Sequence, residues 1–273
     1  QTFTTTLPHL DKFSYIGAWC GSYRSQTYKD GKKVAPVVTV VCNFTKPAAG
    51  QPALLSADEA NTLFHEFGHA LHNLFKDVHY YGVASVPRDF VELPSQIDEH
   101  WAFEPEVLNV YAKHYQTGEV IPAGLVEKMD KSGKYGQGFA TAEYLAASLL
   151  DMDYHVLKEI PDDMDVMQFE AETLGKRGLL KQIPSRYRTT YFNHTMGGGY
   201  TAGYYSYIWA EVLDCDAYEA YKETGDIFNQ EVAGKFRKYI LTPGCIDDAM
   251  DMYVNFRGKE PGIDPLLKNR GLK

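Results

Sequence analysis

The sequence predicts a mainly α-helical, multihelical domain with a small β-sheet near its N-terminus. From about residue 53 onward, apolar residues recur at helical spacing between Gly and Pro residues. Only the segment 34–44 is rich in β-branched residues and too short for a typical helix, and its Pro36 suggests a start just after a turn or at an edge. We therefore expect loops and the small sheet over 1–52 and a helical region over 53–273, together forming one domain.

Composition excludes several classes of protein. The net charge of −9 argues against a nucleic-acid partner, because phosphate binding needs clustered Lys and Arg. No apolar run approaches transmembrane length, and a basic-then-apolar signal pattern is missing, so we expect no membrane partner. The four cysteines are far apart and are interpreted as reduced thiols, with a disulfide as the alternative. We expect a cytoplasmic protein, or a periplasmic one if a signal has been removed.

A helix is expected to begin at a Ser-x-x-Glu capping box formed by Ser56 and Glu59. Apolar residues then follow at helical spacing to Phe75. A second helix is expected over 89–101, where Pro94 marks the first turn or a kink. Further helices are expected near 105–116, 122–131, 138–159, 165–175, 201–222, 229–241 and 246–256.

The first of these helices contains a His-Glu-x-x-His motif. His65 and His69 are four residues apart, so their side chains lie on one face and can share a metal ion. Glu66 stands where its carboxylate can reach a metal-bound water. The alternative is a solvated helix face with two unrelated histidines. The capping box and the half-buried helix favour the metal site, and the hypothesis is a peptidase that uses one Zn²⁺ ion.

A third metal ligand should lie downstream. Position 75 is Phe, which excludes the pattern in which a third His follows closely. Glu92, 23 residues after His69, fits the class in which a second helix supplies a Glu, and Glu99 is the competing candidate. Spacing favours Glu92 only slightly, and Glu99 or Asp98 could instead orient an imidazole.

A second group of residues lies around three consecutive glycines at 197–199, which allow the backbone to approach a ligand closely. Tyr200, Tyr204 and Tyr207 follow at i, i+4 and i+7, on one helix face. Their hydroxyls, with His194, could donate hydrogen bonds to an oxyanion. Without further information, core or interface packing is the commoner role of such a tyrosine stripe.

Two arginines lie just upstream, and one more histidine follows the motif. Arg186 and Arg188 are candidates to bind the C-terminal carboxylate of a substrate, with an ion pair as an equally good alternative. His72, three residues after His69, is expected to pack beside the site rather than bind the metal.

Residues 65–72 together with 88–101 resemble the thimet oligopeptidase family of zinc peptidases, and residues 256–272 are most similar to its bacterial peptidyl-dipeptidase branch (Dcp). The resemblance implies a zincin-type catalytic fold. It also implies that the Glu of Phe-Val-Glu-x-Pro-Ser-Gln, here Glu92, is the third zinc ligand. By the same resemblance, His194, Tyr200 and Tyr207 contact substrate and stabilise the transition state.

The implied activity is zinc-dependent hydrolysis of short peptides, with Glu66 as the general base and dipeptides released from the C-terminus. An endo-oligopeptidase and an inactive peptide-binding fragment are the alternatives. Family members carry a large N-terminal helical portion. We expect such a portion to be a binding partner of the present chain.

Overall fold

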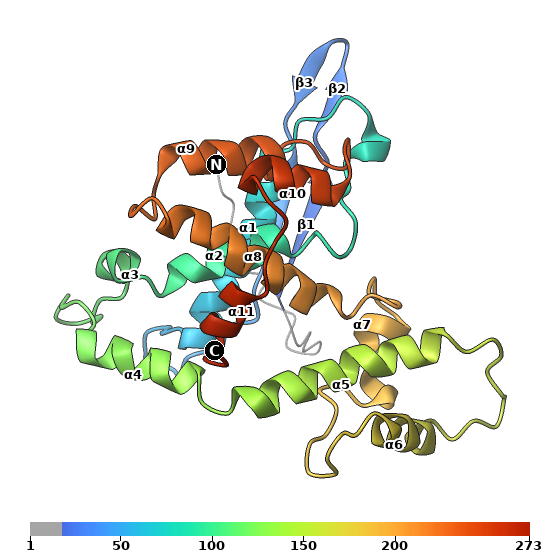
Figure 1. The fold of residues 1–273 in the computed structure, drawn as a ribbon. Coiled ribbons are helices and arrows are strands. Elements are labelled where there is room, and N and C mark those ends of the chain that lie inside the picture. Colours follow the sequence, from blue (N-terminus) through green and yellow to red (C-terminus); the bar gives the residue numbers. More distant parts are fainter. Residues whose placement is uncertain (1–17) are drawn as a thin grey trace.

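The computed structural model describes residues 18–273, so residues 1–17 of the segment in which loops and the small sheet are expected lie outside the described residues. The described residues form eleven α-helices and two small two-stranded sheets, as Figure 1 shows. The mainly α-helical fold with a small β-sheet near the N-terminus is confirmed. The division into segments 1–52 and 53–273 stays a prediction.

The two sheets come from four short strands. One sheet pairs β1 with β4 in antiparallel fashion, and the other is a hairpin of β2 and β3. Asp30 and Gly31 at the hairpin turn have φ of 50° and 74°, values typical of a tight two-residue turn. The strands are β1 (Trp19–Arg24), β2 (Thr27–Lys29), β3 (Lys32–Val34) and β4 (Val37–Val41).

The single strand expected over 34–44 is therefore divided between two strands. Val34 ends β3, and β4 begins only at Val37. Pro36 lies between them, where its missing N–H breaks no ladder hydrogen bond.

Helix α1 spans Ala57–Phe75 and begins at the expected capping box. The Ser56 hydroxyl accepts the Glu59 N–H at 3.1 Å, and the Glu59 carboxylate accepts the Ser56 N–H at 2.8 Å. These bonds satisfy two of the free N–H groups at the helix start.

Helix α2 spans Leu93–Ala102, so the start expected at residue 89 is wrong. Pro94 lies in its first turn and produces no kink, because that turn needs no N–H donor there. Residues 88–92 form a turn that brings Glu92 to the N-terminal end of α2.

Helices α1 and α2 pack against each other, with β1 and β4 beside α1 and helix α8 (Ser206–Lys222) beside α2. The two helices α1 and α2 approach each other closely at Gly68, where an added Cβ would lie 2.2 Å from the Pro94 carbonyl oxygen. The main core lies where α2, α8 and the C-terminal helices meet. Its largest fully buried members include Leu93, Ile97, Leu213, Tyr218, Ile240 and Tyr253.

The remaining helices surround this centre, and the long helix α5 runs along the lower side of Figure 1 with α6 beside it. Their bounds are α3 Pro105–Tyr111, α4 Ala123–Gly133, α5 Gln137–His155, α6 Val166–Lys176, α7 Asn193–Met196, α9 Gln230–Phe236, α10 Ala249–Arg257 and α11 Asp264–Asn269. Short 3₁₀ turns lie at Tyr81–Val83 and Thr189–Tyr191, and a π-helical turn at Arg237–Leu241 follows α9.

Several expected helix bounds differ from the structure, and one of these differences bears on the site. The helix expected over 201–222 begins only at Ser206, because residues 201–205 form a turn in which Ala202 has φ of 50°. The helix expected over 105–116 ends at Tyr111. Helices α7 and α11 were not expected, since both are short. Among the described residues, no helix has the length and apolar character needed to span a bilayer.

Candidate active site

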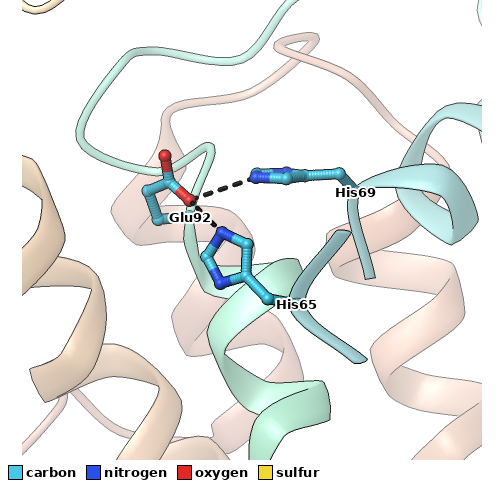
Figure 2. Close-up of side chains that lie close together, drawn as sticks. All are labelled: His65, His69 and Glu92. Carbon is cyan, nitrogen blue, oxygen red and sulfur yellow. Dashed lines mark ion pairs between the residues drawn. The ribbon is translucent and has the colours of Figure 1, made fainter. Parts of the chain in front are cut away.

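Three potential metal ligands meet where α1 faces the N-terminal end of α2. The Glu92 Oε2 atom is 3.3 Å from His65 Nε2 and 3.2 Å from His69 Nε2, as Figure 2 shows. Two ligand atoms bound about 2.0–2.1 Å from a tetrahedral zinc ion would be separated by about 3.3 Å. The two distances from Glu92 therefore fit a single tetrahedral ion, and all three donor atoms lie within 4.8 Å of one another.

Neighbouring side chains hold this donor set in place. The His65 Nδ1 atom is 2.6 Å from Glu99 Oε1, and the other oxygen of Glu99 accepts a hydrogen bond from Asn61 Nδ2 at 2.6 Å. With its proton on Nδ1, His65 presents the lone pair of Nε2 to the centre of the site. Spacing left Glu92 and Glu99 as alternatives, and the structure places them on opposite ring nitrogens of His65. Asp98 instead lines a cavity between α1 and α2.

The electrostatics of the site favour positive charge. Burial opposes a charge on His65, but the carboxylates of Glu92 and Glu99 outweigh it and raise the His65 pKa. Burial likewise opposes ionisation of Glu92, and hydrogen bonds from the two histidines lower its pKa well below the usual value. An ionised carboxylate that is only 2% exposed needs a cationic partner, and a divalent ion meets this need.

Glu66 lies beside the three donors and takes no part in their contacts. Burial raises its pKa, partly offset by His65 and His69. Its Oε2 atom is buried and has no hydrogen-bond partner among the described residues. A buried carboxylate oxygen without a donor is unusual, and here it can accept a proton from a water bound at the site.

The aromatic side chains of the glycine-rich segment reach the same site. The Tyr200 hydroxyl donates to Glu92 Oε1, and the Tyr207 ring stacks on the Tyr200 ring with centroids 4.9 Å apart. The His194 ring centroid is 6.0 Å from that of Tyr200 and 6.2 Å from that of Tyr207. Burial raises the pKa of both phenols, so each stays protonated and can donate a hydrogen bond. Tyr204, in contrast, is buried in a small core cluster.

Helix α5 fixes the backbone of this tyrosine segment. Asp151 is fully buried and accepts the N–H groups of Ala202 and Tyr204 at 3.1 and 3.0 Å. Seven residues earlier on the same helix, the Tyr144 hydroxyl accepts the N–H of Ile208 at 3.3 Å. Sequence reasoning missed Asp151, because no local pattern reveals a contact across 51 residues.

Helix α2 contributes further contacts to α8. Gln96 Nε2 donates to the Tyr207 carbonyl oxygen at 3.1 Å, which ties the helix after Glu92 to the helix of Tyr207. His100 Nε2 is 2.7 Å from Asp214 Oδ1, and Cys215 lies close to both. This contact links the two helices.

Comparison with known proteins agrees with this geometry. A model described as peptidase family M3 matches residues 9–272.

The chain belongs to peptidase family M3.

Curated M3 relatives confirm the resemblance found in the sequence. The chain is 46% identical to a dipeptidyl carboxypeptidase of Escherichia coli (strain K12) over 259 residues and 45% identical to that of Salmonella typhimurium. It is 40% identical to oligopeptidase A of Escherichia coli over 262 residues. Each alignment covers 94% of this chain but only 38% of the relative, so the chain spans less than two fifths of their length.

Within this M3 chain, the two arginines proposed for carboxylate binding differ. Arg188 Nε lies 2.6 Å from a carboxylate oxygen of buried Glu170, which also accepts the Thr189 N–H, so Arg188 belongs to a structural ion pair. The Arg186 side chain is 52% exposed and lies 4.0 Å from Glu143. Its charge lowers the His194 pKa in addition to the larger effect of burial, which places it near the site.

Two other residues complete the description of the site in the M3 chain. Arg88, which the sequence did not single out, has its guanidinium carbon 4.6 Å from the centre of the Tyr200 ring. His72 is only 3% exposed and belongs to no group of converging ligand atoms among the described residues. This buried position agrees with the expectation that His72 packs beside the site and does not bind the metal.

Proposed function

We propose that the chain is the catalytic portion of a zinc-dependent peptidase. The observation that carries this proposal is the convergence of His65 Nε2, His69 Nε2 and Glu92 Oε2, together with a buried Glu66 carboxylate whose pKa responds to the charges of these three residues. The donor set is one that zinc prefers, two imidazoles and a carboxylate, and three protein donors leave the fourth position of a tetrahedral ion for water or substrate.

When bound, zinc would supply Lewis acidity and lower the pKa of a water molecule toward neutrality. Glu66 accepts the proton of that water as the water attacks a peptide carbonyl, and it returns the proton to the leaving amine nitrogen. Its burial suits this role, because a raised carboxyl pKa makes the group a stronger base. Tyr207, with His194, donates hydrogen bonds to the oxygen on which negative charge develops, and Tyr200 adds to this group only when its hydroxyl hydrogen is released from Glu92.

The proposed substrates are short peptides without stable structure. Among the relatives are proteins named dipeptidyl carboxypeptidase, which favours release of dipeptides from the C-terminus. Others are named oligopeptidase A, and an endo-oligopeptidase is the alternative. Arg186 is the proposed partner of a substrate C-terminal carboxylate, since Arg188 already pairs with Glu170.

The central test compares the chain with its Glu66→Gln variant. We expect both to bind one zinc ion by metal analysis, and we expect only the parent to hydrolyse a fluorogenic peptide. Turnover by the variant would contradict the role of Glu66. Because relatives are longer than this chain, both proteins should be assayed alone and with an added N-terminal portion of the family as the proposed partner.

A second assay separates the release of C-terminal dipeptides from endo-oligopeptidase activity. A peptide with a blocked C-terminus is resistant to a dipeptide-releasing enzyme and is cleaved by an endo-oligopeptidase. Bound zinc without turnover, with or without the partner portion, would instead support a fragment that only binds peptides.

A further inference from the structure

The two carboxylate oxygens of Glu92 have different surroundings. Oε2 faces both histidines and accepts a hydrogen bond from the Ser95 hydroxyl at 2.9 Å. Oε1 accepts the hydroxyl hydrogen of Tyr200. This contact joins the glycine-rich segment to a proposed metal ligand across 108 residues.

We propose that Tyr200 is a positioning residue of the metal centre. Its hydroxyl holds Oε1, so that Oε2 alone is turned toward His65 and His69 and would be the Glu92 oxygen offered to zinc. This proposal rests on the proposed function and extends it, because Tyr200 then acts on the ligand before any substrate is present. The oxyanion role falls mainly to Tyr207 and His194.

The position of Tyr200 is fixed from several sides. Its N–H donates to the His194 carbonyl oxygen at 2.9 Å, and its own carbonyl oxygen accepts the Gly203 N–H at 2.9 Å. The Arg88 guanidinium lies over its ring, and an added Cβ at Gly199 would be only 2.6 Å from Arg88 Nη2. The arginine thus contacts both the ring and the backbone just before it, and a side chain at 199 would disturb this contact.

The burial of Glu92 makes its hydrogen bond from the Tyr200 hydroxyl important. With Glu92 only 2% exposed, an oxygen that lost its donor would have little access to water. Such an unpaired oxygen favours rotation of the carboxylate or binding of the metal through both oxygens. Partners that orient a metal ligand in this way typically change metal affinity by about 10–100-fold when removed.

The test is the zinc affinity of the Tyr200→Phe variant, measured by competition with a chromogenic chelator. We expect affinity to fall by about 10–100-fold while the ring and its packing remain. The matched control is Tyr207→Phe, which also removes a half-buried phenol hydroxyl; that hydroxyl bonds to the Tyr200 hydroxyl, but the hydrogen bond from Tyr200 to Glu92 remains in the variant. It should keep the affinity of the parent within about twofold, although both variants should lose peptidase activity.

A second variant, Arg88→Ala, removes the guanidinium from the Tyr200 ring at an exposed position. We expect a smaller loss of zinc affinity in the same direction. Unchanged affinity in Tyr200→Phe, or equal losses in the Tyr200 and Tyr207 variants, would overturn the proposal. A parent chain that binds no zinc would refute the proposed function itself, a result that the metal analysis of the parent shows separately.

Discussion

Substitution of Gly68 by Ala should damage the metal centre through the backbone. An ideal Cβ at this position would lie 2.2 Å from the Pro94 carbonyl oxygen, 2.7 Å from Ser95 Cα and 3.0 Å from the Pro94 carbonyl carbon. All three atoms belong to the backbone of α2, so no side chain can rotate away. Ordinary contact therefore requires α1 and α2 to separate by about 1 Å.

This separation acts directly on the donor set, because Glu92 lies two residues before Pro94 while both histidines lie on α1. Metal sites tolerate distance errors of about 0.2 Å, so a shift of about 1 Å should lower zinc affinity by roughly tenfold or more. Overpacking costs about 1–3 kcal/mol, and replacing a helical Gly by Ala returns about 0.5–1 kcal/mol. The net loss in the free energy of unfolding should be roughly 1–2 kcal/mol.

The assays are urea unfolding of the metal-free protein and competition for zinc with a chelator. Gly234→Ala is the matched control, since Gly234 is helical and an added Cβ there meets no atom within 4 Å. The control should gain about 0.5–1 kcal/mol and keep its zinc affinity. If Gly68→Ala is as stable as the control and binds zinc equally well, the reasoning about the helix contact is wrong.

Three further predictions follow from the same structure. Glu99→Gln should weaken zinc binding by about tenfold in chelator competition, because it removes the charge that orients His65; equal binding would contradict that role. Burial lowers the His72 pKa to about 3, so the unfolded chain binds a proton below its ordinary pKa of 6.5 that the folded chain does not. Stability should therefore fall as the pH drops from about 6.5 toward 3, by up to about 1.4 kcal/mol per pH unit, and urea unfolding of metal-free His72→Leu at pH 7 and pH 5 should show a smaller loss than the parent. Asp151→Asn should lower the free energy of unfolding by about 1–3 kcal/mol, because one buried N–H loses its acceptor. Asp153→Asn, which affects only the outer ion pair with Arg177, should cost less than about 1 kcal/mol, and similar losses in the two would refute the assignment.

The metal side of the site could be predicted because its signals are local. A capping box fixes the start of α1, and spacing of four residues places His65 and His69 on one face. Spacing could not separate Glu92 from Glu99, because both lie near enough to reach the histidines. What separates them is the turn before α2 and the close contact at Gly68, neither of which has a distinct signal in the sequence.

The roles of the tyrosines could be predicted only from the family resemblance. Periodicity treats Tyr200, Tyr204 and Tyr207 as equivalent members of one helix face, but the helix begins only at Ser206. The left-handed turn at Ala202 breaks the pattern and sends Tyr204 into the core while Tyr200 reaches Glu92. This turn depends on Asp151, and such a contact between distant segments cannot be read from spacing.

The order in which the site can assemble follows from where its parts lie along the chain. Glu92 follows His65 by only 27 residues, whereas the Tyr200 contact with Glu92 closes a loop of 108 residues. Each doubling of loop length adds about 0.6 kcal/mol of closure entropy, so the tyrosine contact costs about 1.2 kcal/mol more. A growing chain carries every proposed zinc donor well before α8 has been synthesised. We therefore expect the three proposed donors to come together first, and the segment 200–207, held by α5, to close over them later.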